Sequence, residues 1–336
     1  MNTIRVSKFM IGLALSLCSL MAQAQHHSHP ASPKSGKPGV LILAHGGNAD
    51  WNNEVNKLAQ ATDKTYPSEV AFGMATKGNI EAAIHRLVSR GVSEIVAVPL
   101  FVSPHSSVVT STQYLLGVIS DAPADLAIFA RMSHGHGGGE YAAHSTDPTK
   151  PIDLPVPVHM TAALGRHLLV AQILLARAQT ISQKPSQETV VLVAHGPVPD
   201  EENKKWLADM AVLAEQMKRS SSFRDIRYLT VRDDAPAPIR DQATAELRQL
   251  ITSIKAENRR ALVVPLLLSY GGIERGIKKR LEGLDYTLPN QALLPDERLT
   301  EWVLVSVRES LRKANSVRKA RPSFPSNRNR PNPLRG

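Results

Sequence analysis

Short, almost uninterrupted apolar runs alternate along the chain with stripes of apolar residues at helical spacing. Val40–Ala44 and Ile95–Phe101 are runs of this kind, typical of strands that are buried on both faces of a sheet. A shorter run at 70–74 lies between them, and stripes beginning at Trp51 and Ile80 predict the connecting helices. This alternation of strands and helices predicts a parallel sheet with right-handed crossovers.

The pattern is less regular after the third strand. Ala127–Ala130 predicts a fourth strand, and the stretch 133–157, rich in Gly, His and Pro, predicts a long loop. Thr161–Thr180 is strongly apolar and predicts a helix.

The same pattern then starts again. The run Val190–Gly196 repeats Val40–Gly46 at a distance of 150 residues, and the Pro-Leu motif of the strand at 96–101 recurs 166 residues later, at 261–267. Two motif pairs in the same order indicate an internal duplication. The expected halves are residues 39–183 and 189–312. The fold class that follows is α/β, with two duplicated halves, each a parallel sheet flanked by helices, and a cleft between them.

The N-terminus predicts export. Residues 1–24 combine two basic residues, an apolar run at Phe9–Met21 and a small-x-small sequence at 22–24, which is typical of a signal peptide. Cleavage would leave a mature chain that begins near Gln25 and lacks Cys18, the only cysteine. A lipoprotein interpretation of Cys18 is weak, because bulky Leu17 precedes it. No other apolar stretch is long enough to span a bilayer, so we expect an exported, periplasmic protein that is not an integral membrane protein.

The net charge of +10 comes from the two ends of the chain. Residues 1–24 and 312–336 hold 10 of the 40 basic residues and no acidic ones, which leaves 30 basic against 30 acidic residues between them. A basic-patch nucleic-acid-binding protein is therefore not expected. Residues 25–38 and 313–336 have the composition of a disordered linker and a disordered basic tail.

Three histidines follow predicted strands. His45 and His195 stand at the same place in the two halves, each before a glycine, and His105 follows the third strand of the first half. The second half has Gly271 where the first has His105. Ligands of open parallel sheets bind at the carboxyl ends of the strands, and imidazole can hold a metal or accept a proton near neutral pH.

These motifs carry a resemblance to a known family. A strand ending in Ala-His-Gly, a helix opening with Trp, a Val-Pro-Leu-Phe strand followed by His, and the Leu-Gly-Arg-His-Leu-Leu element at 164–169 resemble the class II tetrapyrrole chelatases, and among them the CbiX-like sirohydrochlorin cobaltochelatases and ferrochelatases. Leu168 stands where that element usually has Pro. The resemblance implies insertion of a divalent metal (Co, Fe or Ni) into sirohydrochlorin or a related tetrapyrrole, without ATP or any other nucleotide.

The resemblance also implies site residues. His45 and His105 match the two active-site histidines of the family, but the acid that the family carries after its second strand is replaced by Met74. Alignment of the halves places Asp233 at the matching position of the second half. We therefore expect a composite site in one cleft, with His45, His105 and Asp233 as catalytic residues. His45, His105 and His195 are the expected metal ligands, and His195 also binds the cofactor.

Two further histidine groups are candidate metal collectors, one at 26–29 and one in the Gly-rich loop. The loop group consists of His134, His136 and His144. Such tracts collect transition metals, and the alternative interpretation is a flexible polar loop. The alternative for the whole protein is a non-catalytic periplasmic carrier of metal or haem on the same scaffold. A hydrolase is disfavoured, because no Gly-x-Ser-x-Gly elbow or phosphate-binding glycine loop is present.

Overall fold

The computed structural model describes residues 36–132 and 147–320. The expected signal peptide, the histidines at 26–29, and His134, His136 and His144 lie outside these residues. Within them, no helix is long and apolar enough to cross a membrane.

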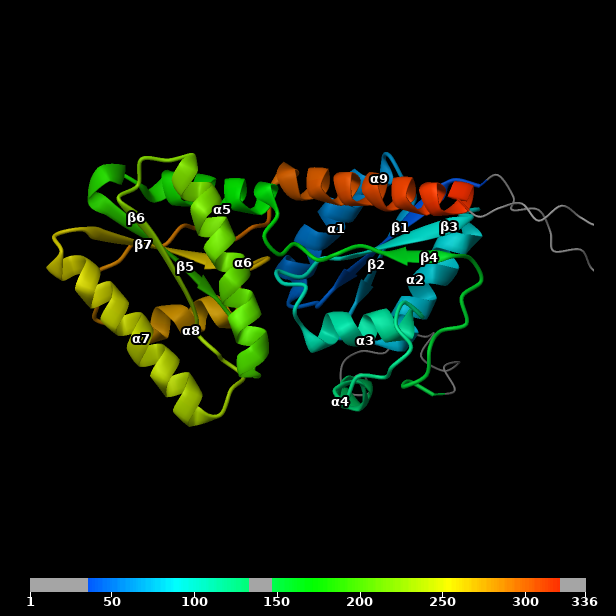
Figure 1. Ribbon diagram of the computed structural model, residues 1–336, viewed down its shortest axis with the longest axis horizontal. Helices are drawn as coiled ribbons and strands as arrows, with labels where there is room; N and C mark the ends of the chain where they lie inside the picture. The colour runs from blue at the N-terminus through cyan, green and yellow to red at the C-terminus, as the bar shows by residue number, and fades with distance from the viewer. Residues whose placement is uncertain (1–35, 133–146, 321–336) are drawn as a thin grey trace, which may run out of the picture. The chain divides into compact units, whose positions relative to one another are not determined.

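The first sheet has four parallel strands in the order β2-β1-β3-β4 (Figure 1). Its strands are β1 Pro38–Ala44, β2 Ser68–Phe72, β3 Glu94–Pro99 and β4 Val158–Met160. Alternate residues of β1 enter different core clusters: Val40 and Ile42 pack on one face of the sheet, and Leu41 and Leu43 pack on the other. Burial on both faces explains why the strand is continuously apolar.

Helices connect these strands. They are α1 Ala49–Asp63, α2 Lys77–Ser89, α3 Ser107–Leu115 and α4 Leu126–Met132. The strand predicted at Ala127–Ala130 is wrong, because these residues belong to α4. Leu126, Phe129 and Ala130 are buried while Ile128 is exposed, which is the spacing of a helix face and not of a strand.

The fourth strand of the first sheet is instead β4, in a segment that was expected to be loop up to residue 157 and helix from 161. The helix, α5 Leu168–Ile181, begins later than predicted. His167 is its N-cap, and Gly165 turns the chain before it with a φ of 48°.

The second sheet repeats the first with three parallel strands in the order β6-β5-β7. Its strands are β5 Glu188–Ala194, β6 Asp225–Thr230 and β7 Arg260–Leu266, and its helices are α6 Asp200–Arg219, α7 Ala237–Ala256 and α8 Gly272–Arg280. A short 3-10 turn, Pro185–Gln187, precedes β5. His45 and His195 each follow the strand that pairs with both neighbours, as the duplication predicts.

The last helix of each half packs on the sheet of the other half. Helix α5 contacts β7 and α6, whereas α9, Glu297–Ala320, contacts α1, β3 and β4. One core cluster therefore contains residues of both sheets. The sequence repeats at 39–183 and 189–312 are thus not the groups of elements that pack together. Residues 313–320, expected to be disordered, belong to α9, and Arg318 donates a 2.7 Å hydrogen bond to Glu94.

Candidate functional site

The two candidate active-site histidines of the first half, His45 and His105, lie beyond neighbouring strands. Because β1 and β3 pair in parallel, their carboxyl ends lie at one edge of the sheet. His45 directly follows β1 and is exposed, and its Nδ1 lies 2.6 Å from the carbonyl oxygen of Gly46. A carbonyl only accepts hydrogen bonds, so Nδ1 carries the proton and Nε2 keeps a lone pair.

His105 lies in the loop between β3 and α3, and its neighbours come from the second half of the sequence. The Trp206 indole Nε1 of α6 donates a 2.6 Å hydrogen bond to the His105 carbonyl oxygen. The His105 Nε2 atom lies 3.5 Å from Asp209 Oδ2, with exposed side-chain fractions of 36% for the histidine and 13% for the aspartate. One helix thus contacts both the backbone and the imidazole of His105.

A second carboxylate on the same helix lies near this histidine. Burial raises the pKa of Glu202, and the negative charge of Asp125 raises it further, while Lys205 and His105 oppose the shift. Glu202, Trp206 and Asp209 are spaced i, i+4, i+7, so they share one face of α6. Sequence reasoning missed these acids, although their spacing around a buried tryptophan was a readable signal.

The Asp233 carboxylate has a partner that the sequence did not indicate, and its catalytic role stays a prediction. It forms an ion pair with Arg280 at the end of α8. This charge-assisted hydrogen bond occupies the partly buried carboxylate of Asp233. His195 has a different partner, because its Nε2 lies 3.2 Å from Asp234 Oδ2. Met74 packs against the core of the first sheet, which leaves no acid at that position.

The structure therefore shows no preassembled metal site formed by His45, His105, His195 and Asp233. In residues 36–132 and 147–320, no three His, Cys, Asp or Glu side chains come close enough to hold a metal ion. The roles of the histidines remain predictions. The structure supplies a different acid for His105, namely Asp209 instead of Asp233.

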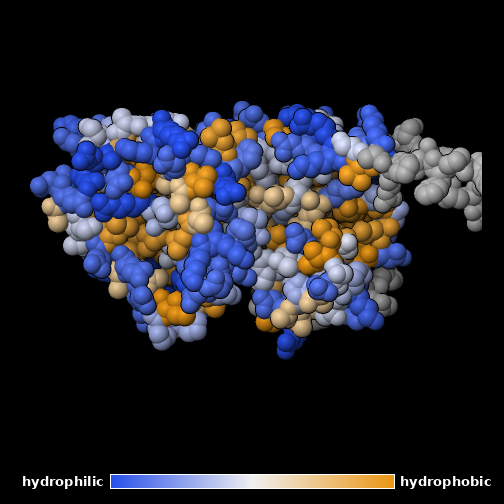
Figure 2. Space-filling view, in the orientation of Figure 1, coloured by the Kyte–Doolittle hydropathy of each residue, from blue (hydrophilic) through white to orange (hydrophobic). Residues whose placement is uncertain are grey.

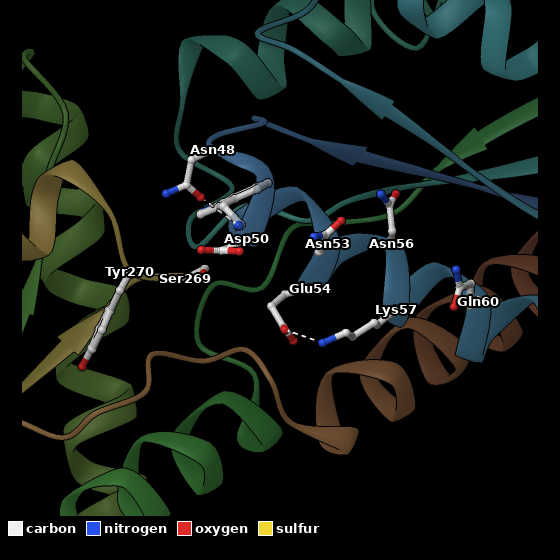
Figure 3. A pocket seen from close by; sticks show the side chains of 10 residues that line it. Asn48, Asp50, Asn53, Glu54, Asn56, Lys57, Gln60, Ser269 and Tyr270 are labelled. Carbon is white, nitrogen blue, oxygen red and sulfur yellow. Dashed lines mark hydrogen bonds and ion pairs between the residues drawn. The ribbon is translucent and has the colours of Figure 1, made fainter.

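A cavity of about 690 Å³ lies beside α1. Its walls are the outer face of α1 and the loop after β7, and Figure 3 shows Ser269 and Tyr270 opposite the helix. It is lined by Asn48, Asp50, Trp51, Asn53, Glu54, Asn56, Lys57, Gln60, Ser269 and Tyr270. This volume is within the range of small-molecule sites, and the lining side chains include amides and one ion pair of 2.7 Å between Glu54 and Lys57.

Comparison with known proteins finds a family model that matches part of the chain. Residues 39–181 match the CbiX family model. The chain is similar in structure to SirB from Bacillus subtilis with Fe3+, at 18% identity and a TM-score of 0.56, over 83% of this chain and 98% of that chain. No curated protein sequence matches the chain.

Two further solved structures are similar. One is a multi-domain protein from Deinococcus radiodurans with structural similarity to chelatases, at 15% identity and a TM-score of 0.48, over 82% of this chain and 55% of that one. The other is CbiX, the terminal enzyme for biosynthesis of siroheme in denitrifying bacteria, at 16% identity and a TM-score of 0.46, over 81% and 99%. Of the three, only SirB exceeds a TM-score of 0.5, and at 18% identity the likeness is one of fold.

Proposed function

Residues 39–181 are CbiX-like, and from this premise we propose that the protein inserts a divalent metal into sirohydrochlorin or a related tetrapyrrole without a nucleotide. Co, Fe and Ni are the candidate metals, and both metal and tetrapyrrole are substrates. The observation that carries the proposal is the pair of imidazoles at the carboxyl ends of adjacent strands, exposed His45 and partly exposed His105. This edge is where open parallel sheets bind ligands.

The two imidazoles suit the two tasks of the reaction. The Nε2 atom of His45 has no hydrogen-bond partner within the described residues, so its lone pair can replace water on an incoming metal ion. Each divalent metal that enters a tetrapyrrole displaces two pyrrole N–H protons, of which a neutral imidazole can accept one near neutral pH while water takes the other. We assign that second task to His105, whose surroundings hold it in place.

A spectroscopic assay tests this function. Mature protein is mixed with sirohydrochlorin and Co2+, Ni2+ or Fe2+, and the rate of Soret change is compared with the protein-free rate. His45→Ala should abolish insertion, and His105→Ala should slow it by about 10²-fold or more. His85→Ala, which removes an exposed imidazole from α2, is the control and should leave the rate unchanged. Equal rates in all three variants would contradict the proposal.

The runner-up function is a non-catalytic carrier of metal or haem. Met74 in place of the acid and the commitment of Asp233 to Arg280 favour it. The same assay separates the two functions, because a carrier would bind tetrapyrrole or metal without accelerating insertion. A wild-type rate equal to the protein-free rate, with measurable binding, would select the carrier.

We also propose that the protein is exported and that its histidine tracts collect metal. Mature protein should begin near Gln25, which N-terminal sequencing of periplasmic material tests. A lipid-modified chain that starts at Cys18 would overturn the signal-peptide interpretation. Replacement of His134, His136 and His144 by Ala should lower the number of bound metal ions without changing the insertion rate.

A further inference from the structure

Helix α6 contacts His105 at two atoms. Trp206 binds the backbone carbonyl oxygen at 2.6 Å, and Asp209, one turn further along the same face, places Oδ2 3.5 Å from the imidazole Nε2. The first contact fixes where the histidine backbone lies. The second contact places a carboxylate oxygen at the imidazole itself.

The Asp209 carboxylate lacks another explanation. Its Oδ2 is buried, and within the described residues it has no hydrogen-bond partner. The Arg166 Nε atom is 4.0 Å from the other oxygen, on a guanidinium that is mostly exposed. A buried carboxylate oxygen without a donor destabilises the fold, so a donor is expected near this atom. The imidazole Nε2 at 3.5 Å is the one placed to donate after a small rotation.

Packing does not require an acid at this position. Asp209 is the tenth residue of α6, and the tenth residue of the corresponding helix α1 is Leu58, a buried apolar side chain. The flanking buried positions of the two helices match, since Ala59 and Met210 are both buried. The repeat therefore accommodates a leucine where the second half carries a carboxylate.

We propose that Asp209 is a positioning residue that holds His105 as the Nε2–H tautomer and leaves the Nδ1 lone pair for the substrate. Histidine tautomers are set by the hydrogen bond of the other ring nitrogen, often to a carboxylate. Nδ1 of His105 makes no hydrogen bond in the part of the chain that the structure describes, so it is the nitrogen left for chemistry. Only this last step, the use of Nδ1, rests on the proposed metal insertion.

The acid thereby comes from the other half of the chain. Met74 leaves the first half without the carboxylate of its family, and Asp209 reaches His105 from α6, 104 positions away in the sequence. The first half would then depend on the second half for the orientation of His105 as well as for its core.

The tautomer of His105 in the metal-free full-length protein tests the inference directly. Nitrogen-15 NMR with two-bond ring correlations distinguishes Nε2–H from Nδ1–H, and the His105→Ala spectrum identifies the signals. We expect the Nε2–H tautomer in the wild type and in Asp209→Asn, whose amide oxygen still accepts. Asp209→Leu, which introduces the side chain that α1 carries at Leu58, should lose that preference.

The matched control removes an equal charge elsewhere on the same helix. Glu215 is exposed and pairs with Arg219 four residues on. Figure 2 shows that the surface in the region of α6 is largely hydrophilic. Glu215→Leu should leave the tautomer unchanged. An Nδ1–H tautomer in the wild type, or an unchanged tautomer in Asp209→Leu, would overturn the inference. If Asp209→Leu fails to fold, Asp209→Ala takes its place in the same comparison with the wild type.

Kinetics separate this inference from the proposed function. Loss of an outer carboxylate typically lowers activity by 10–100-fold, so Asp209→Leu should reduce kcat of insertion by about 10-fold or more, with KM for the tetrapyrrole nearly unchanged. Asp209→Asn should recover part of kcat. If wild-type protein inserts no metal, the proposed function fails while the NMR result still decides the positioning role. If KM rises and kcat does not change, Asp209 contributes to binding and the positioning role is wrong.

Discussion

Arg177 joins α5 to the segment that leads into α9. Its guanidinium donates hydrogen bonds to the carbonyl oxygens of Ala292 (2.7 Å), Leu293 (3.3 Å) and Pro295 (2.8 Å), and lies 3.4 Å from Asp296 Oδ2. The arginine and aspartate side chains are each only 10% exposed. Helix α5 packs on the second sheet and α9 packs on the first, so this contact links the two helices that pack on the sheet of the other half.

The cost of removing the guanidinium follows from this geometry. Arg177→Met keeps an unbranched apolar stem but leaves three carbonyl oxygens without their donor, while Asp296 keeps its ion pair with Arg298 at 2.7 Å. A buried acceptor that is left without its donor costs about 1–3 kcal/mol. We therefore predict that the free energy of unfolding falls by about 3–5 kcal/mol.

Urea unfolding, followed by tryptophan fluorescence at pH 7, measures the loss. The control is Arg219→Met in α6, where the guanidinium is 75% exposed and pairs with an exposed Glu215, so its loss should be within about 0.5 kcal/mol. A fall of less than about 1 kcal/mol for Arg177→Met would refute the reasoning.

Two further predictions concern stability. In the same urea assay, Gly196→Ala should lower the free energy of unfolding by at least about 1 kcal/mol more than Gly283→Ala does. Both glycines have a positive φ, 76° and 79°, but a Cβ at Gly196 would lie 2.5 Å from the Thr230 Cβ while one at Gly283 meets nothing within 4 Å; equal losses would contradict this. Burial alone would raise the pKa of Asp296, but hydrogen bonds and charge from Arg298 lower it, so its stabilisation is present above the unfolded pKa of about 4 and is lost as pH falls below it. Unfolding measured from pH 7 to pH 3 should show a smaller loss in Asp296→Asn than in the wild type, and parallel curves would show that another group governs the acid limb.

The repeating pattern of buried strands could be predicted almost completely from the sequence. Each strand of a parallel sheet covered on both faces must be apolar at successive positions, so runs such as Val40–Ala44 and Val190–Ala194 have few alternative interpretations. The duplication, the α/β class and the CbiX-like character of 39–181 followed from these runs and the motifs at their ends. The same runs located His45 and His195 directly after β1 and β5, and His105 in the loop after β3, although their roles stay predictions.

Short or ambiguous segments were read less well. Four apolar residues at Ala127–Ala130 fit a strand or one turn of a buried helix, and only the burial of every third or fourth side chain distinguishes them. The helix expected from Thr161 begins at Leu168, because Gly165 adopts a left-handed conformation before it. A Cβ at Gly165 would lie 3.2 Å from the Pro104 side chain. Local composition does not reveal this contact.

Only the tertiary structure decided which halves exchange helices and which acid meets His105. Asp233 was inferred by aligning one half on the other, which assumes that equivalent positions face equivalent partners. Its partner is instead Arg280, 47 positions away, and the acid beside His105 is Asp209 on α6. Periodicity along the chain reports which face of an element is buried, because that depends on neighbours within a few residues. It carries no information about which distant element covers that face, since contacts between residues far apart in the sequence are selected by the packing of the whole core.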